Sequence, residues 1–336
     1  MEEISWGILG TAEIAEEQVI PAIQKSVNGK VAAIASRNPA RKATKLAEQF
    51  DIPTIYSSYE ELLADETIDA VYVPLPNELH AEWTKKAAAY GKNVLCEKPA
   101  GLTALQVEEM VAACKSANIT FMESMMYQFH PQHKRVKEII AEGAIGEVKQ
   151  MRASFSFPLE KPGNFRLKSQ VDGGGSIFDI GCYTIHAIRS FLGEPTDVLF
   201  VEETLTADGN TDIAAIGIFE HKNGKKSYFD CGMNMSTRNE YEIVGTKGTI
   251  RVPKAFIPQA DGEGIIELIP NEGPVKQEQI ISDYYVEGVE FFTRQIIDGK
   301  DLTHLAEDTL NNLKAMDAVR NWKKQTETIR RCTEKL

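Results

Sequence analysis

A glutamate and a lysine end a short apolar run in VLCEKPAGL, residues 94–102. The apolar residues predict a buried strand, so Glu97 and Lys98 fall at its carboxyl end. An ammonium group at such a position can hold a substrate hydroxyl and, as a cation, lower the pKa of a neighbouring acid. Pro99 fixes the backbone of the turn and is compatible with a cis Lys98–Pro99 bond. A surface Glu–Lys pair before a turn is the alternative interpretation.

A second set of acid–base side chains follows the consecutive glycines Gly173–Gly175. Asp179, Tyr183 and His186 stand at i, i+4 and i+7, so they project from one face if the segment is an α-helix. A carboxylate, a phenol and an imidazole on one face can pass protons along a row. Structural roles are the alternatives, because Ser176 and Asp179 fit a capping box and Tyr183 fits a core aromatic residue. His186 fits a supporting position better than a catalytic one.

The first apolar run of the chain leads into a glycine-containing loop, ILGTAEIAE. Gly10, Ala12 and Ala15 occupy the three positions of the dinucleotide-binding pattern G-x-G-x-x-G/A. The glycine allows a tight turn, the small residue at position 12 lets backbone approach a pyrophosphate, and Ala15 lets the helix pack close to the strand. A tight strand–helix turn without a ligand is the alternative. The predicted dinucleotide contacts in this loop are Gly10, Thr11, Ala12 and Ile14.

The end of the second predicted strand distinguishes between two cofactors. NAD sites usually carry an acid there, which binds the ribose 2′-hydroxyl. This chain reads IASRNPARK, with Ser36, Arg37 and Asn38 at the strand end and Arg41 and Lys42 in the next turn. A hydroxyl and a bidentate guanidinium suit a 2′-phosphate, so the sequence predicts NADP and makes NAD the less favoured cofactor. The alternative is a solvated run of charges that opens a helix.

Strand and helix patterns alternate over roughly the first 125 residues. The predicted strands are Ile4–Leu9, Val31–Ser36, Ala70–Val73, Asn93–Cys96 and Thr120–Glu123. The helices between them reach Lys25 and cover about Pro39–Phe50, Leu79–Tyr90 and Ala104–Asn118. Continuous apolar strands joined by helices predict an α/β Rossmann domain at 1–124, with a doubly wound parallel sheet whose carboxyl strand ends face a ligand. The predicted cofactor contacts at those ends are Pro74, Asn77, His80, Glu97 and Lys98, although His80 could simply open a helix.

The pattern changes after Ser124. Alternation of apolar and polar residues in 151–157 and 227–235 predicts antiparallel strands with one buried face. Residues 245–248, GTKG, read as a hairpin turn. Two helices follow at about Tyr284–Asp298 and Ala306–Thr326, and they can pack back on the first domain. Residues 125–336 are therefore predicted to form an α+β domain for substrate binding, built on a mostly antiparallel sheet.

Composition and charge exclude several classes of protein. The formal net charge of -12 argues against a nucleic-acid partner, because phosphate binding needs a basic face. We see no secretory signal and no apolar run long enough for a membrane span, so no membrane partner is expected. The five widely spread cysteines form no C-x-x-C pair, which indicates reduced thiols and a cytoplasmic location. Cys182 and His186 at i, i+4 are too few ligands to predict a metal site.

Taken together, these motifs resemble the family of glucose–fructose oxidoreductase, inositol dehydrogenase and rhizopine-catabolism proteins, the Gfo/Idh/MocA oxidoreductases. The resemblance covers essentially the whole chain and rests on GILGTAEIA, PLPNELH, CEKPA, MYQFHPQ, NFR and GGGSIFDIGCYTIH. It implies a Rossmann domain followed by a domain with a large open sheet, through which family members usually assemble into dimers or tetramers. It also implies that Lys98, in the E-K-P motif, lies at the catalytic centre.

One departure from the common family pattern points to a branch of the family. Many members read D-x-G-x-H-x-x-D on the helix of the second domain, and the corresponding residues here are Asp179, Gly181, Tyr183 and His186. Tyrosine in place of the usual histidine resembles the dimeric dihydrodiol dehydrogenases and the NADP-dependent xylose or glucose 1-dehydrogenases, in which tyrosine takes the acid–base role. Gln128 stands where close relatives commonly have arginine, so a substrate preference does not transfer with the resemblance.

The resulting hypothesis is a hydride transfer between nicotinamide and a hydroxyl or carbonyl carbon of a sugar, polyol or cyclic diol. Tyr183 exchanges the hydroxyl proton beside the cationic Lys98, and Asp179 binds a substrate hydroxyl or orients the pair. The further predicted substrate-side residues are Asn164, Arg166 and His186. The alternatives are an inositol-type dehydrogenase, an NADP-binding sensor without turnover and a glycosidase that retains NAD. Intact Lys98 and Tyr183 argue against the sensor, and Arg37 argues against the glycosidase.

Overall fold

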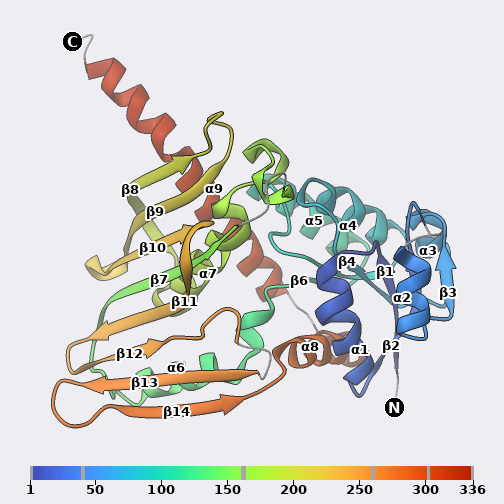
Figure 1. Ribbon diagram of the computed structural model, residues 1–336, viewed down its shortest axis with the longest axis horizontal. Helices are drawn as coiled ribbons and strands as arrows, with labels where there is room; N and C mark the ends of the chain where they lie inside the picture. Colours follow the sequence, from blue (N-terminus) through green and yellow to red (C-terminus); the bar gives the residue numbers. More distant parts are fainter. Residues whose placement is uncertain (1–2, 39–41, 160–163, 259–261, 301–302, 334–336) are drawn as a thin grey trace. The chain divides into compact units, whose positions relative to one another are not determined.

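The structure is a computed structural model that describes residues 3–38, 42–159, 164–258, 262–300 and 303–333, without the side chains of Phe165 and of residues 323–333. The chain forms two compact units (Figure 1). The first comprises Met1–Phe129 and Asp283–Leu310, and the second comprises His130–Ser282 and Asn311–Leu336. The chain thus first passes between units after Phe129, whereas the sequence pattern places this point at residue 124.

The first unit is built on a six-stranded parallel sheet of order β3–β2–β1–β4–β5–β6. Its strands are β1 (Ile4–Leu9), β2 (Gly29–Ala35), β3 (Thr54–Tyr56), β4 (Ala70–Val73), β5 (Asn93–Cys96) and β6 (Phe121–Glu123). Its helical segments up to β6 are η1 (Ala15–Val19), α1 (Ile20–Lys25), α2 (Thr44–Gln49), α3 (Tyr59–Ala64), η3 (Asn77–Leu79), α4 (His80–Ala89) and α5 (Ala104–Ser116). The strand order reverses between β1 and β4, and sheets of this kind bind ligands at that point, outside the carboxyl strand ends. The predicted Rossmann fold is confirmed.

Helix α8 (Tyr284–Asp298) belongs to the core of the first unit, although it lies far along the chain. The ring of Phe292 lies 5.4 Å from that of Trp6 on β1, and both side chains are fully buried. Thr293 Oγ1 donates a hydrogen bond to Asn28 Oδ1 over 2.7 Å in the same interior. The segment that begins at Asp283 therefore completes the core of the first unit.

The second unit contains an eight-stranded sheet of order β14–β13–β12–β11–β7–β10–β9–β8. Its strands are β7 (Val148–Pro158), β8 (Pro195–Leu205), β9 (Asp212–His221), β10 (Lys226–Gly232), β11 (Asn234–Gly245), β12 (Gly248–Val252), β13 (Glu263–Pro270) and β14 (Lys276–Ile281). The remaining long helices are α6 (Pro131–Ala141), α7 (Cys182–Leu192) and α9 (Thr303–Thr333). Among the described strands of this eight-stranded sheet, β7 and β10 alone pair in parallel, so the predicted mostly antiparallel sheet is confirmed.

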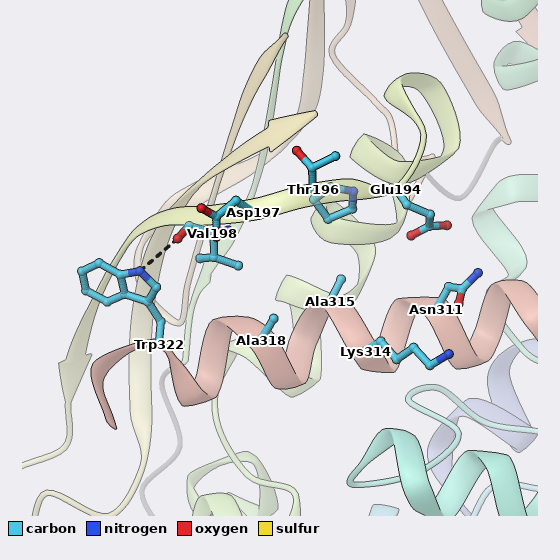
Figure 2. Close-up of a pocket in the computed structure, with 10 residues that line it drawn as sticks. Glu194, Thr196, Asp197, Val198, Asn311, Lys314, Ala315, Ala318 and Trp322 are labelled. Carbon is cyan, nitrogen blue, oxygen red and sulfur yellow. Dashed lines mark hydrogen bonds between the residues drawn. The ribbon is translucent and has the colours of Figure 1, made fainter. Parts of the chain in front are cut away.

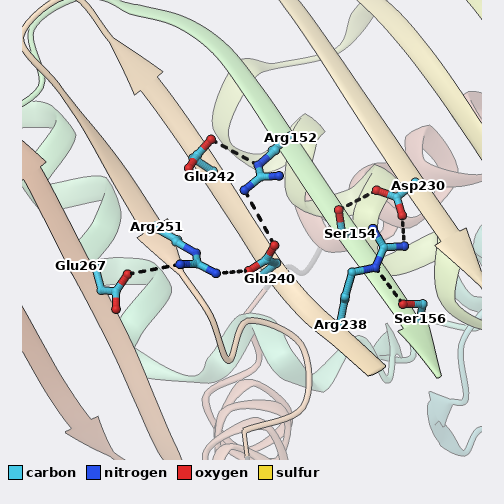
Figure 3. A network of polar contacts seen from close by, with 9 residues as sticks. All are labelled: Arg152, Ser154, Ser156, Asp230, Arg238, Glu240, Glu242, Arg251 and Glu267. Carbon is cyan, nitrogen blue, oxygen red and sulfur yellow. Dashed lines mark hydrogen bonds and ion pairs between the residues drawn. The ribbon is translucent and has the colours of Figure 1, made fainter. Parts of the chain in front are cut away.

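Alternation along the strands gives this sheet one packed face and one open, polar face. The packed face carries fully or almost fully buried side chains, among them Ala153, Phe155, Phe229, Cys231 and Tyr241. On the open face (Figure 3), Arg152 Nε lies 3.2 Å from Glu242 Oε1. Arg238 pairs with Asp230, which also accepts a hydrogen bond from Ser154. The packed face is the one that supports α7, which carries Tyr183.

Three details differ from the sequence prediction or lie outside it. The sequence pattern does not predict β3, because this strand has only three residues, follows Pro53 and is half exposed. The alternating run 227–235 is two strands, since β10 ends at Gly232 and β11 begins at Asn234. Residues 39–41, where the second helix is predicted to begin, lie outside the described residues, and α2 begins at Thr44. In the part of the chain that the structure describes, no helix has the length and apolar character that a membrane span requires.

Candidate active site

The loop after β1 has the backbone conformation that a dinucleotide-binding turn requires. Gly10 has a φ of 111°, in the left-handed region that favours glycine, and its N–H donates to Ala35 O on β2 over 2.9 Å. A Cβ at this position would lie 3.2 Å from Leu75 Cδ2. The helical turn begins at once, because Ala15 N donates to Ala12 O over 3.1 Å. The loop thus leaves backbone, not side chain, at the place where a pyrophosphate would approach.

The carboxyl end of β2 presents a hydroxyl and a guanidinium, as predicted from the sequence. Ser36 is half buried and its Oγ accepts a hydrogen bond from Asn38 N over 3.2 Å. The Arg37 side chain is exposed, and its guanidinium beside the Tyr59 hydroxyl acts to lower the pKa of that phenol. Lys42 pairs with Glu16 at 3.8 Å, and Arg41 lies outside the described residues.

Lys98 is the one residue from Val94 to Gly101 that is not buried. Its neighbour Glu97 is 9% exposed and accepts a hydrogen bond from Tyr72 over 2.6 Å. A residue of β6 binds the turn, because Glu123 Oε1 accepts a hydrogen bond from Ala100 N over 2.7 Å. The Lys98–Pro99 peptide bond is cis. The E-K-P turn is therefore mostly buried, and its lysine is its accessible group.

His80 links the ends of two strands. Its ring nitrogens lie 2.9 Å from Pro99 O and 2.6 Å from Leu75 O, and the residue is fully buried. Burial lowers the pKa of His80, although both carbonyl contacts act in the opposite direction. These contacts hold the turn that follows β5 against the turn that follows β4. The predicted contacts Pro74 and Asn77 lie in the latter turn, where Pro74 is buried and Asn77 is half buried.

One buried hydroxyl at the strand ends has no protein partner among the described residues. Ser124 directly follows β6, is 3% exposed, and its Oγ has no hydrogen-bond partner. A buried polar atom without a partner costs free energy unless a ligand or water satisfies it. The open backbone at Gly10, the groups of Ser36 and Arg37 and this hydroxyl together fit a bound dinucleotide. The sequence pattern did not single out Ser124.

In the second unit, Asp179 and Tyr183 are the two residues from Gly174 to Arg189 that are not buried. The segment is helical, but Ile177–Gly181 form a π-helical turn, which closes hydrogen bonds over five residues instead of four. The i, i+4 spacing of a regular α-helix therefore does not describe this segment. Asp179 and Tyr183 are instead distinguished from their neighbours by their partial exposure. The centroid of the Tyr183 ring lies 5.5 Å from that of Phe155 and 6.0 Å from that of Phe256.

Asp179 forms an ion pair with a predicted substrate-side residue. Arg166 Nε donates to Asp179 Oδ2 over 2.7 Å, and the carboxylate side chain is 13% exposed. Asn164 Oδ1 accepts from Arg166 N over 3.0 Å, which shapes the NFR segment. The structure thus brings Asn164, Arg166 and Asp179 together, with Asp179 fixed in orientation by the guanidinium.

The interpretation of Ser176 and Asp179 as a capping box is wrong, because the Ser176 side chain makes no cap hydrogen bond. Ser176 Oγ donates to Asp212 Oδ2 over 2.6 Å, and Ile177 N donates to the same oxygen over 2.8 Å. Asp212, on β9, is 1% exposed and burial raises its pKa. This carboxylate accepts the bonds that a local cap would accept, because Gly175 (φ 110°) packs directly against it without a side chain. The sequence pattern misses Asp212, since the contact spans 36 residues.

His186 is 3% exposed and lies on the buried side of α7, next to a second buried histidine. His133 Nδ1 lies 2.9 Å from the hydroxyl of Tyr241, and Nε2 lies 3.0 Å from Ala255 O. A neutral ring satisfies both contacts, by accepting from the phenol and donating to the carbonyl. Burial, reinforced by the charge of His130, lowers the pKa of His133 to about 3.

We expect His133→Gln to reduce the acid sensitivity of the fold. The folded chain keeps this ring neutral down to pH of about 3, whereas the unfolded chain takes up a proton near pH 6.5. The stability that His133 contributes is therefore complete above pH 6.5 and is lost as pH falls toward 3. The variant should lose about 1–3 kcal/mol at pH 7.5, and its deficit should shrink between pH 6.5 and 4. Thermal unfolding of the parent and the variant across this pH range measures the deficit, and His304→Gln, at an exposed histidine, is the control. A deficit that does not change with pH would contradict the prediction.

Two family models match the chain. An oxidoreductase family with an NAD-binding Rossmann fold matches residues 4–125, and a Gfo/Idh/MocA C-terminal domain matches residues 133–251. The chain belongs to the Gfo/Idh/MocA oxidoreductase family. The resemblance inferred from the sequence motifs is confirmed.

Individual Gfo/Idh/MocA relatives are similar over most of the chain. D-xylose 1-dehydrogenase (NADP(+)) 2 of Haloferax volcanii is 37% identical, over 94% of this chain and 95% of that protein. Trans-1,2-dihydrobenzene-1,2-diol dehydrogenase of Xenopus laevis is 32% identical, over 74% of each chain. The crystal structure of a 3-ketoreductase from Actinomadura kijaniata with NADP and TDP-benzene has a TM-score of 0.90 and 30% identity, over 95% of this chain and 98% of that one.

The second unit of this Gfo/Idh/MocA protein also has a surface groove of about 370 Å³, between the start of β8 and α9 (Figure 2). Trp322 Nε1 donates to Val198 O over 3.0 Å at one end. No predicted site residue lines the groove, so we do not include it in the candidate active site. Among the described residues, no group of three or more His, Cys, Asp or Glu side chains could hold a metal ion.

Proposed function

We propose that this protein is an NADP-dependent oxidoreductase that transfers a hydride between nicotinamide and a hydroxyl or carbonyl carbon of a sugar, polyol or cyclic diol. The observation that carries the proposal is the exposure pattern of a Gfo/Idh/MocA chain, in which Lys98 and the pair Asp179 and Tyr183 are the accessible groups of otherwise buried segments. The xylose and dihydrodiol dehydrogenases among the relatives support this substrate class.

The proposed cofactor site lies at the carboxyl ends of the parallel strands. NADP, when bound, supplies or accepts the hydride. The loop at Gly10 lets backbone approach the pyrophosphate, while Ser36 and Arg37 bind the 2′-phosphate. The buried hydroxyl of Ser124 gains a polar partner from the cofactor. An NADP-bound structure and an NADP-named dehydrogenase among the relatives support NADP over NAD.

The proposed proton chemistry uses two side chains on one substrate oxygen. During oxidation the hydroxyl proton passes to Tyr183 in its phenolate form, which the cationic Lys98 favours, and the C–H electron pair leaves with the hydride, so that a C=O bond forms and the phenol is regenerated. Lys98 holds the same oxygen and stabilises the negative charge that develops on it. Asp179, oriented by Arg166, accepts a hydrogen bond from a neighbouring hydroxyl. Reduction follows the same path in reverse.

We also propose that the protein acts in the cytosol as a homodimer or homotetramer joined through the open face of the eight-stranded sheet. Ile216, which is 41% exposed, pairs directly across the strands with Asp230 and lies on that face. The proposal is supported chiefly by the resemblance to family members, which usually assemble through this sheet. Light scattering of the purified protein tests the assembly, and a monomer mass would contradict it.

Initial rates of NADP and of NAD reduction, measured by absorbance, test the proposed function. D-xylose, D-glucose, myo-inositol and benzene dihydrodiol serve as substrates. We expect turnover of at least one aldose or the diol, with NADP preferred over NAD. Turnover of myo-inositol alone would reassign the protein to the inositol-type dehydrogenases. Tight NADPH binding without any turnover would identify a sensor, and purification with bound NAD but no net reduction would identify a glycosidase.

A further inference from the structure

The phenol of Tyr59 lies beside the glycine loop, at the start of α3. Its hydroxyl is 3.6 Å from the place where a Cβ on Gly10 would stand. The Arg37 guanidinium, at the end of β2, lies beside the same hydroxyl and acts to lower the pKa of Tyr59. Tyr59 therefore joins the two parts of the chain that the proposed cofactor would contact through its pyrophosphate and its 2′-phosphate.

The fold fixes the Tyr59 side chain from several sides. A capping box between Ser58 and Glu61 sets the first turn of α3. The helix is seated on β1, because a Cβ on Gly7 would collide with Leu62. The Tyr59 ring packs edge-on against Trp83 of α4 at a centroid distance of 4.7 Å, and the residue is 6% exposed. The Tyr59 hydroxyl beside the exposed Arg37 side chain is therefore held in place by contacts that do not involve Arg37.

We propose that Tyr59 is a positioning residue that sets cofactor specificity, by holding the Arg37 guanidinium beside the glycine loop, where it meets the phosphate that distinguishes NADP from NAD. This inference rests on the proposed NADP dependence. Holding the guanidinium in advance reduces the side-chain entropy lost when the phosphate binds.

A phenol suits this task better than a carboxylate would. A carboxylate would also hold Arg37, but it would neutralise the guanidinium and repel an incoming phosphate. Burial raises the pKa of Tyr59, although Arg37 acts against this, so the phenol is neutral at physiological pH. A neutral phenol beside the guanidinium can accept from an Arg37 N–H and keeps its own proton, which it can donate to a phosphate oxygen.

The test is a comparison of Tyr59→Phe with Tyr56→Phe. Tyr56 is a nearby tyrosine on β3 whose hydroxyl donates to Asp65 over 2.8 Å, so its loss removes a phenol hydroxyl without touching Arg37. Fluorescence titration gives Kd for NADPH and NADH, and calorimetry gives Kd for 2′,5′-ADP and 5′-ADP. We expect Tyr59→Phe to weaken NADPH and 2′,5′-ADP about 5- to 20-fold and to change NADH and 5′-ADP less than about 2-fold. Tyr56→Phe should leave all four constants unchanged.

A double-mutant cycle separates positioning from a direct contact. In an Arg37→Ala background, the further change Tyr59→Phe should have no additional effect on NADPH affinity if the phenol acts mainly through the guanidinium. Equal weakening of all four ligands by Tyr59→Phe, or no weakening, would overturn the inference. A parent protein that binds NADPH no better than NADH would instead contradict the proposed function, before any variant is compared.

Discussion

Replacing Tyr183 with phenylalanine is expected to lower kcat by about 100-fold or more. The substitution removes the hydroxyl that exchanges a proton with the substrate, and no other group of α7 replaces it, because the helix is otherwise buried as far as Arg189. Phenylalanine keeps the ring contacts with Phe155 and Phe256, so the packed face of the sheet should be undisturbed. The loss should therefore appear in turnover and not in folding.

Three measurements on Tyr183→Phe distinguish these effects. Initial rates with the preferred substrate give kcat, NADPH fluorescence gives cofactor affinity, and thermal unfolding gives stability. Exposed Tyr90→Phe is the control for loss of a phenol hydroxyl and should match the parent in all three. A variant with parental kcat would show that Tyr183 is a packing residue and that the proton goes elsewhere.

Replacing Lys98 with methionine is expected to lower kcat by a similar factor of about 100 to 1,000. Methionine fills nearly the same space but carries no charge, so the developing negative charge on the substrate oxygen loses its stabilising partner. The rest of the E-K-P turn should hold, because Glu97 accepts from Tyr72 and from the backbone N–H of residue 98, and Ala100 N donates to Glu123, and the substitution changes none of these groups. Lys98→Arg should recover part of the rate, since it restores the charge with altered geometry.

The control for Lys98→Met is Lys85→Met, which removes a surface ammonium paired with Glu109 at 2.8 Å. Kinetic constants and NADPH affinity should be measured for both variants and the parent. If Lys98→Met weakened NADPH binding while kcat stayed parental, the lysine would be a cofactor contact and not a catalytic residue.

The sequence predicts those parts of the fold that local periodicity encodes. Apolar runs such as Ala70–Val73 and Asn93–Cys96 correspond to the observed β4 and β5, and GTKG at 245–248 joins the hairpin of β11 and β12. The predicted position of Lys98 at a strand end follows from the same local signal. Strand β3 carries too few apolar residues to give such a signal.

Contacts between distant residues set the details of the candidate site, and local patterns do not report them. Asp212 caps the turn that leads to Tyr183, and Glu123 closes the E-K-P turn, yet each lies on another strand. The approach of Tyr59 to Arg37 likewise depends on how α3 packs on β1. In each case the residue type is visible in the sequence, whereas its partner is decided by the packing of the whole unit.

The most direct test of hydride transfer uses the best substrate of the panel, deuterated at its hydroxyl-bearing carbon. The parent protein is incubated with this substrate and NADP, and the cofactor is analysed by mass spectrometry and proton NMR. We expect reduced cofactor that carries the deuterium at C4 of the nicotinamide, together with the oxidised substrate. Reduced cofactor without label, or no reduced cofactor with any substrate of the panel, would contradict the account.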